Sequence, residues 1–172
     1  MRKVRLALPL LTLPLAALTA ACASATATPT AEVRELLDRG QITALVDRLG
    51  RALDEGRFDE LRTIYAPDAT AKTPGGTAEG RDALIAQASR NHGEHLRIQH
   101  VIGNVLIDLR GDTAEVRANL IATFALAASD GTPPQPVYTL GEVYRFDAIR
   151  TGEGWRLSRV QTTPIWSTGT RP

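Results

Sequence analysis

The second half of the chain consists of extended runs, and these runs constrain the fold more than any other feature. Alternating apolar and β-branched residues predict strands at 97–109, 113–127, 137–149 and 155–163. Short glycine-containing turns predict hairpins between the first two strands and between the last two. A longer proline-containing link at 129–136 joins the two hairpins, since proline cannot donate to a sheet ladder. Strands of this length must bend, so we expect a strongly curved antiparallel or mixed sheet.

The first half of the chain has helical periodicity instead. The best amphipathic stripe consists of Ile42, Leu45, Val46, Leu49, Ala52 and Leu53. It predicts a helix from a Thr30 cap to about Asp54, interrupted at Gly40. A second, shorter helix is expected from Phe58 until Pro67 stops it, and a third at 80–88 after a loop at 72–80. Three N-terminal helices followed by long strands predict an α+β domain in which helices and a bent sheet enclose a pocket.

The first 21 residues have the three-part layout of a secretory signal peptide. Basic residues near the start precede an apolar run at 6–18 and then small residues around Cys22. Pro9 and Pro14 argue against a buried helix, and the run is too short to remain in a membrane. We therefore expect an exported protein with a signal peptide at 1–21, a tether at 22–30 and one domain at 31–168.

Cys22 leaves two routes of processing open. The stretch 18–22 resembles a bacterial lipobox, which predicts a lipidated Cys22 and a membrane-anchored lipoprotein. Ordinary cleavage between small residues predicts a secreted protein. Cys22 is the only cysteine, so an internal disulfide is impossible and lipidation would account for a lone thiol in an exported chain.

Charge and motifs exclude several classes of function. Cleavage before Cys22 leaves 151 residues with 17 basic and 19 acidic side chains, so no basic patch predicts nucleic-acid binding. The sequence contains no glycine-rich phosphate loop, serine nucleophile elbow or CxxC motif. His92 and His95 flank a polar run, but their spacing suits no metal site and further ligands are missing. We expect neither a cofactor nor a metal.

Several motifs together resemble a known family. They lie at 52–61, 65–69, 99–104, 111–114 and 154–157. In order and spacing they are similar to those of SnoaL-like proteins of the nuclear transport factor 2-like (NTF2-like) superfamily. The resemblance implies a cone of curved sheet around a deep pocket, and homodimers that pair through the sheet.

The same resemblance identifies candidate catalytic residues. Scytalone dehydratase-like and bile-acid dehydratase-like enzymes carry an aspartate on the first long helix and a histidine at the start of a central strand, which Asp54 and His100 match. A carboxylate on the imidazole would fix its tautomer and raise its basicity for proton abstraction next to a carbonyl. These enzymes also hold the substrate oxygen with tyrosines and a second histidine, where this chain has Leu53, Thr73 and Leu140.

Strand alternation adds candidate ligand-binding residues. Glu142 and Tyr144 share one face of their strand, and Arg159 shares a face with Trp155 and Leu157. If these faces point inward, Glu142 and Arg159 form a pocket network, which Trp166 would border; an exposed cross-strand pair is the alternative.

The sequence therefore leaves two candidate functions. One is a cofactor-independent dehydratase or isomerase for a small apolar molecule with a carbonyl group. The other is a non-catalytic ligand-binding or dimerisation module on the same fold.

Overall fold

The computed structural model describes residues 29–128 and 131–172. The predicted signal peptide, Cys22 and most of the tether lie outside these residues. The elements in chain order are α1 (Ala31–Asp54), η1 (Phe58–Thr63), β1 (Tyr65–Thr73), β2 (Gly76–Glu79), α2 (Arg81–Asn91), β3 (Leu96–Arg110), β4 (Thr113–Leu126), β5 (Pro136–Thr151) and β6 (Gly154–Gly169).

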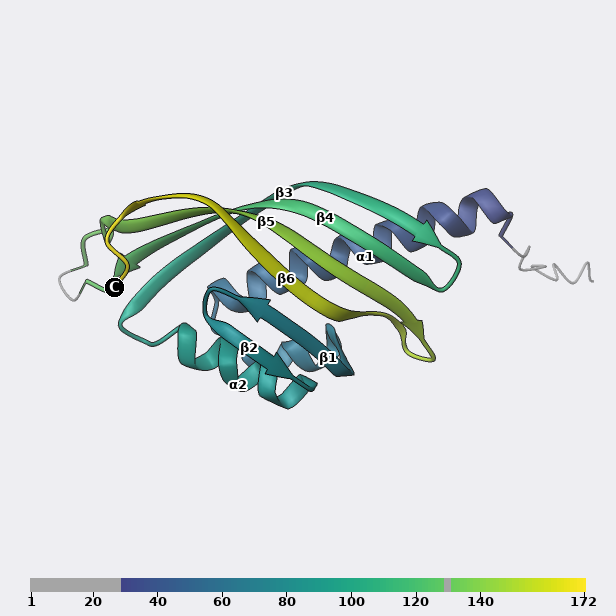
Figure 1. Cartoon of the computed structure of the whole chain (residues 1–172), viewed down its shortest axis with the longest axis horizontal. Helices are drawn as coiled ribbons and strands as arrows, with labels where there is room; N and C mark the ends of the chain where they lie inside the picture. Colours follow the sequence, from purple (N-terminus) through teal and green to yellow (C-terminus); the bar gives the residue numbers. More distant parts are fainter. Residues whose placement is uncertain (1–28, 129–130) are drawn as a thin grey trace, which may run out of the picture.

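The strands form one mixed sheet in the order β2-β1-β6-β5-β4-β3. β1 runs parallel to β6, and every other neighbouring pair is antiparallel. The long strands arch over α1 and α2, which lie on the same side of the sheet (Figure 1). The predicted α+β architecture with a curved mixed sheet is confirmed.

The prediction of three helices is wrong in two respects. α1 continues through Gly40, where the helix faces solvent and tolerates the backbone freedom of glycine. The second helix is only a six-residue 3₁₀ helix, η1, and the expected loop at 72–80 contains a β-hairpin between β1 and β2. Pro67 lies within β1 at a register irregularity against β6, a place where a missing N–H is tolerated.

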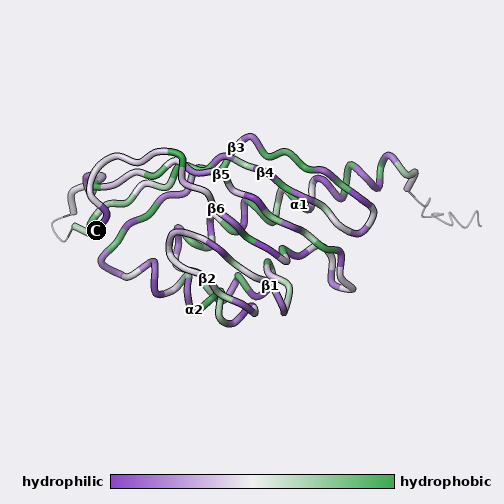
Figure 2. The backbone as a smooth tube through the Cα atoms, in the orientation of Figure 1, coloured by the Kyte–Doolittle hydropathy of each residue, from purple (hydrophilic) through white to green (hydrophobic). Residues whose placement is uncertain are grey.

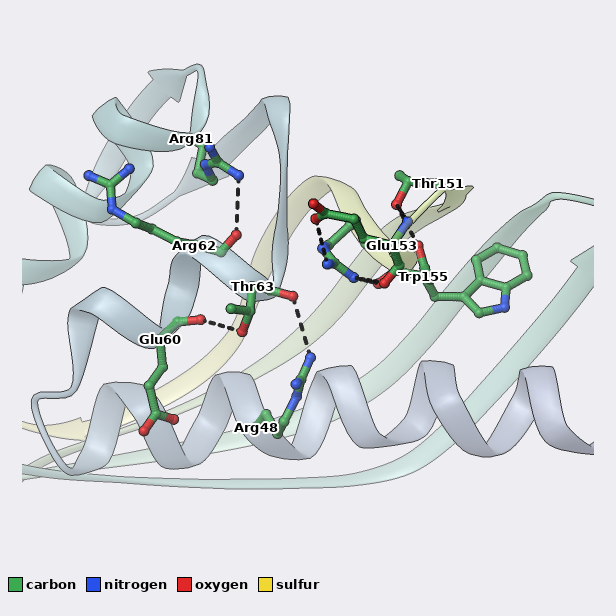
Figure 3. A network of polar contacts seen from close by, with 10 residues as sticks. Arg48, Glu60, Arg62, Thr63, Arg81, Thr151, Glu153 and Trp155 are labelled. Atoms are coloured by element: carbon green, nitrogen blue, oxygen red, sulfur yellow. Dashed lines mark hydrogen bonds and ion pairs between the residues drawn. The ribbon is translucent and has the colours of Figure 1, made fainter.

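Side chains from both α-helices hold η1 in position (Figure 3). Arg48 of α1 donates to the carbonyl oxygen of Thr63 at 3.5 Å, and Arg81 of α2 donates to that of Arg62 at 3.2 Å. The Thr63 hydroxyl donates to the Glu60 carbonyl oxygen at 2.9 Å. These contacts satisfy polar groups of a short helix that could not be stable alone.

Bulges change which face the strands bury. β3 has one extra residue at Asn104, whose φ is +52°, and β6 has extra residues at Ser158 and Ile165. A bulge bends its strand and shifts the alternation of the following residues. Hydrophobic and hydrophilic residues alternate along the long strands (Figure 2).

The core lies between the concave face of the sheet and α1. All six residues of the predicted amphipathic stripe are buried there. They pack against alternate residues of the sheet, among them Leu120, Phe146 and Leu157. None of the helices in the described residues is long and apolar enough to span a bilayer.

Candidate functional site

The last residue of α1, Asp54, meets His100 in the first third of β3. The carboxylate of Asp54 accepts hydrogen bonds from the backbone N–H of His100 at 2.9 and 3.1 Å. Its Oδ1 also lies 2.6 Å from Nδ1 of the His100 ring. The two residues are 46 positions apart in the chain, and only the packing of α1 against β3 brings them together.

This arrangement determines the tautomer of His100. A carboxylate only accepts hydrogen bonds, so Nδ1 of His100 carries the proton in the contact with Asp54. The other ring nitrogen, Nε2, is then the basic one. The His100 side chain is 7% exposed and lines a cavity, so its basic nitrogen is held at a wall that largely excludes bulk water.

A second histidine stacks on the first. The His92 ring lies 5.6 Å from the His100 ring, at an interplanar angle of 30°. Nδ1 of His92 lies 2.8 Å from the carbonyl oxygen of Ala88, which can only accept, so Nε2 is again the unprotonated nitrogen. Burial lowers the pKa of His92, which favours the neutral ring.

The cavity lies between the concave face of the sheet and the two α-helices, and its volume is about 120 Å³. That volume is close to the roughly 150 Å³ of an engineered apolar cavity that holds benzene. Its apolar walls include Leu49 and Leu53 of α1, Leu84 of α2 and Phe124 of β4. The cavity therefore has the size and lining for a molecule built around a single ring.

Polar atoms without partners point to an amphipathic occupant. Among the described residues, buried polar atoms without a hydrogen-bond partner include Gln87 Nε2, His92 Nε2, Glu142 Oε1 and Thr162 Oγ1. All four residues line the cavity. Buried polar groups are nearly always paired, so such a cluster indicates groups that a bound molecule or ordered water would satisfy.

Two of the predicted ligand-binding residues reach the cavity. Glu142 and Tyr144 are both 6% exposed and line it from β5, as alternation predicted. Burial raises the pKa of Glu142, because the charged carboxylate is poorly solvated there. Burial likewise raises the pKa of Tyr144.

Arg159 and Trp166 do not reach this cavity. Arg159 binds Asp147 through two hydrogen bonds of 2.6 and 2.8 Å, and neither Arg159 nor Trp166 lines the cavity. The bulge at Ser158 moves Arg159 to the outer face, and the bulge at Ile165 places Trp166 over Gly141. The proposed pair of Glu142 with Arg159 therefore does not form.

Sequence reasoning missed Tyr65, Gln87, His92 and Thr162 as cavity residues. The sequence pattern places Tyr65 within the expected second helix and His92 beside a polar run. Leu53, Thr73 and Leu140 line the cavity. They occupy the positions at which the dehydratases have tyrosine or histidine, so they supply none of those side chains. Polar groups reach it from other elements instead: Tyr65 from the start of β1, and His92 from the end of α2.

The chain belongs to the SnoaL-like domain family, whose model matches residues 34–161. It is 33% identical over 129 residues to the uncharacterized protein Rv2910c of Mycobacterium tuberculosis, covering 74% of this chain and 85% of that protein.

Solved structures share the fold at lower identity. A Novosphingobium aromaticivorans protein named provisionally as a scytalone dehydratase is 20% identical, with a TM-score of 0.68 over 80% of this chain and 91% of that one. A type 2 hexachlorocyclohexane dehydrochlorinase (LinA) is 17% identical, with a TM-score of 0.70 over 81% and 93%. Proteins named as NTF2-like are also among the structures with this fold, so the superfamily expected from the motifs is confirmed.

Proposed function

We propose that this protein is a cofactor-independent lyase or isomerase that abstracts a proton from a small apolar molecule with a carbonyl group. His100 Nε2 acts as the general base, and Asp54 orients the ring and stabilises the imidazolium that forms. The observation that carries the proposal is the 2.6 Å contact between Asp54 and His100 at the wall of a mainly apolar cavity.

Two further points support this function. The cavity is lined largely by apolar side chains, and low polarity strengthens the coupling between a carboxylate and an imidazolium. The names of two structural neighbours, dehydratase and dehydrochlorinase, denote eliminations, reactions in which a base removes a proton while a leaving group departs.

The test is exchange of the α-protons of cyclohexanone in D₂O, followed by proton NMR. We expect the protein to accelerate exchange, and His100→Ala to lower the rate by about 100-fold, as for loss of a general base. His95→Ala is the matched control, because His95 is exposed and does not line the cavity. Exchange that is equally fast in His100→Ala, with the fold intact by circular dichroism, would contradict the proposal.

A non-catalytic ligand-binding module is the second candidate. The four unpartnered polar atoms of the cavity favour it, since they require an occupant but no reaction. Saturable binding of cyclohexanone without any acceleration of exchange would select this function over the first.

Export and pairing complete the proposal. The protein is exported, with Cys22 either lipidated or part of an ordinary cleavage site, and intact mass spectrometry of material from its own cells distinguishes the two. It pairs as a homodimer through the outer face of the sheet. Four residues of neighbouring strands form a row on this face: Val101, Ile121, Gly141 and Trp166. Val101 is 57% exposed, Ile121 43% and Trp166 48%.

A further inference from the structure

Glu142 is a buried acid that has no role in the proton abstraction by His100 described above. It lies in the middle of β5, is 6% exposed, and faces the same cavity as His100. Arg159, the basic residue expected to pair with it, is occupied by Asp147 on the opposite face of the sheet. Burial raises the pKa of Glu142, which favours the neutral carboxylic acid, a group with one O–H donor.

The strand register places Glu142 across the cavity from His100. His100 pairs with Ala122 of β4, and Ala122 pairs with Leu140 of β5, two residues before Glu142. The backbones of His100 and Glu142 are therefore two strand spacings apart across the sheet, about 10 Å, and two residues apart along it, about 7 Å. Side chains that extend from both positions into the cavity leave room between them for about one six-membered ring.

We propose that Glu142 donates a hydrogen bond from its carboxylic acid to the carbonyl oxygen of the bound molecule, while His100 faces the neighbouring carbon. This deepens the proposed function by assigning the group that stabilises the oxygen, and it restricts the substrates to ring-sized ketones with an acidic α-hydrogen.

The assignment gives a balanced proton transfer. The α C–H bond breaks, its proton moves to Nε2 of His100, and its electron pair forms a carbon–carbon double bond. The carbonyl π electrons move onto the oxygen, whose negative charge the Glu142 O–H stabilises. In an isomerase the carbonyl group re-forms as His100 returns the proton to a different carbon of the conjugated system. In a lyase the carbonyl group re-forms, the enolate double-bond electrons move between the α- and β-carbons, and the leaving group departs from the β-carbon with its bonding electrons and takes the proton from His100. No oxidant or reductant is needed.

The first measurement is the carbon-13 resonance of the carbonyl group of cyclohexanone labelled at that carbon. We expect a downfield shift on binding to the wild-type protein, because a hydrogen bond to the oxygen withdraws electron density from the carbonyl carbon. The shift should disappear in Glu142→Leu, persist in part in Glu142→Gln, whose amide N–H still donates, and persist in His100→Ala. A shift that survives in Glu142→Leu, or a probe that does not bind the wild type, overturns the inference.

The second measurement is the rate of α-proton exchange in the same variants. We expect Glu142→Leu to lower the maximal rate by about 100-fold, as for loss of one oxyanion donor, and Glu142→Gln to retain it within about tenfold. Glu115→Gln, on the outer face of β4, is the matched control. Equal rates in the wild type and Glu142→Leu overturn the assignment.

The two measurements separate this inference from the proposed function. A carbonyl shift that depends on Glu142 in a protein without exchange activity supports the donor and contradicts the enzyme. Exchange that depends on His100 but not on Glu142 supports the enzyme and contradicts the donor.

Discussion

Two aspartates of α1 hold different kinds of partner at opposite ends of the domain. Asp54 binds the backbone and ring of His100 next to the cavity. Asp38 is buried and accepts hydrogen bonds from Arg150 at 2.5 Å and from the indole N–H of Trp155 at 3.1 Å. The guanidinium of Arg150 also lies over the Trp155 ring, 4.6 Å from its centroid. The contact of Asp54 lies beside the cavity, whereas the contact of Asp38 joins α1 to β5 and β6 at the other end of the core.

Asp38→Ala should lower the free energy of unfolding by about 3 kcal/mol, because it leaves the buried indole N–H of Trp155 without an acceptor and the partly buried guanidinium of Arg150 without its buried partner. Asp112→Ala is the matched control, because Asp112 binds the same arginine but its side chain is 80% exposed. It should change stability by less than about 1 kcal/mol. Urea unfolding of both variants checks this, and equal losses would show that burial of Asp38 is not the reason.

The same contact predicts a loss of stability in acid. The hydrogen bond from Arg150 is the main reason that the pKa of Asp38 lies below its ordinary value of 3.8. A lowered pKa in the folded state means that the unfolded chain binds the proton more readily. Stability due to Asp38 is therefore complete above pH 3.8 and is lost as the pH falls through the folded-state pKa. The difference in unfolding free energy between wild type and Asp38→Ala should shrink over that range.

At the level of elements, the bulges decide which side chains reach the cavity. Asn104 takes a left-handed backbone conformation at the bulge of β3, so that Ile102 on one side and Val105 on the other both pack toward the core. Asparagine tolerates this conformation better than most residues, and β-branched residues tolerate it poorly.

Asn104→Val should therefore destabilise the fold by about 1 to 2 kcal/mol, although Asn104 is exposed. Asn119→Val is the control, since Asn119 lies on the outer face of β4 at the last regular pair before the bulge, opposite Gly103, and has no positive φ. Thermal unfolding of the two variants gives the comparison. A loss of stability confined to Asn119→Val would contradict a strained bulge at Asn104.

At the level of the whole molecule, the sheet divides the domain into a cavity side and an outer side. The helices cover the concave side (Figure 1). The outer side carries the exposed apolar row of Val101, Ile121 and Trp166, and Gly141 allows the Trp166 ring to lie flat across the strands, because a Cβ there would come within 2.3 Å of it.

Ile121→Asp should convert the proposed homodimer to a monomer, because two copies of a charge would be buried near the centre of a symmetric interface. Leu36→Asp is the control, since Leu36 is 71% exposed on α1, away from the outer face of the sheet. Sedimentation equilibrium measures the mass. A wild-type protein that is monomeric, or an Ile121→Asp protein that remains dimeric, would contradict pairing through this row.

Local patterns in the sequence were sufficient for much of the fold. Alternation located all four long strands, and the apolar stripe from Ile42 to Leu53 located the buried side of α1, because both periodicities follow from backbone geometry alone. The motifs around Asp54 and His100 were also sufficient to select that pair as the best candidate for a site.

Tertiary structure decided what local patterns do not encode. One extra residue at Ser158 reverses the alternation of β6, which sends Arg159 outward, and Oε1 of Glu142 has no hydrogen-bond partner in the cavity. His92 and Tyr65 join the site because the ends of α2 and β1 converge on the concave sheet. The sequence by itself determined the buried face of α1, the position of α2 and the four long strands. The parallel pairing of β1 with β6, the cavity and its polar groups arise instead from contacts between residues far apart in the chain, which no local periodicity records.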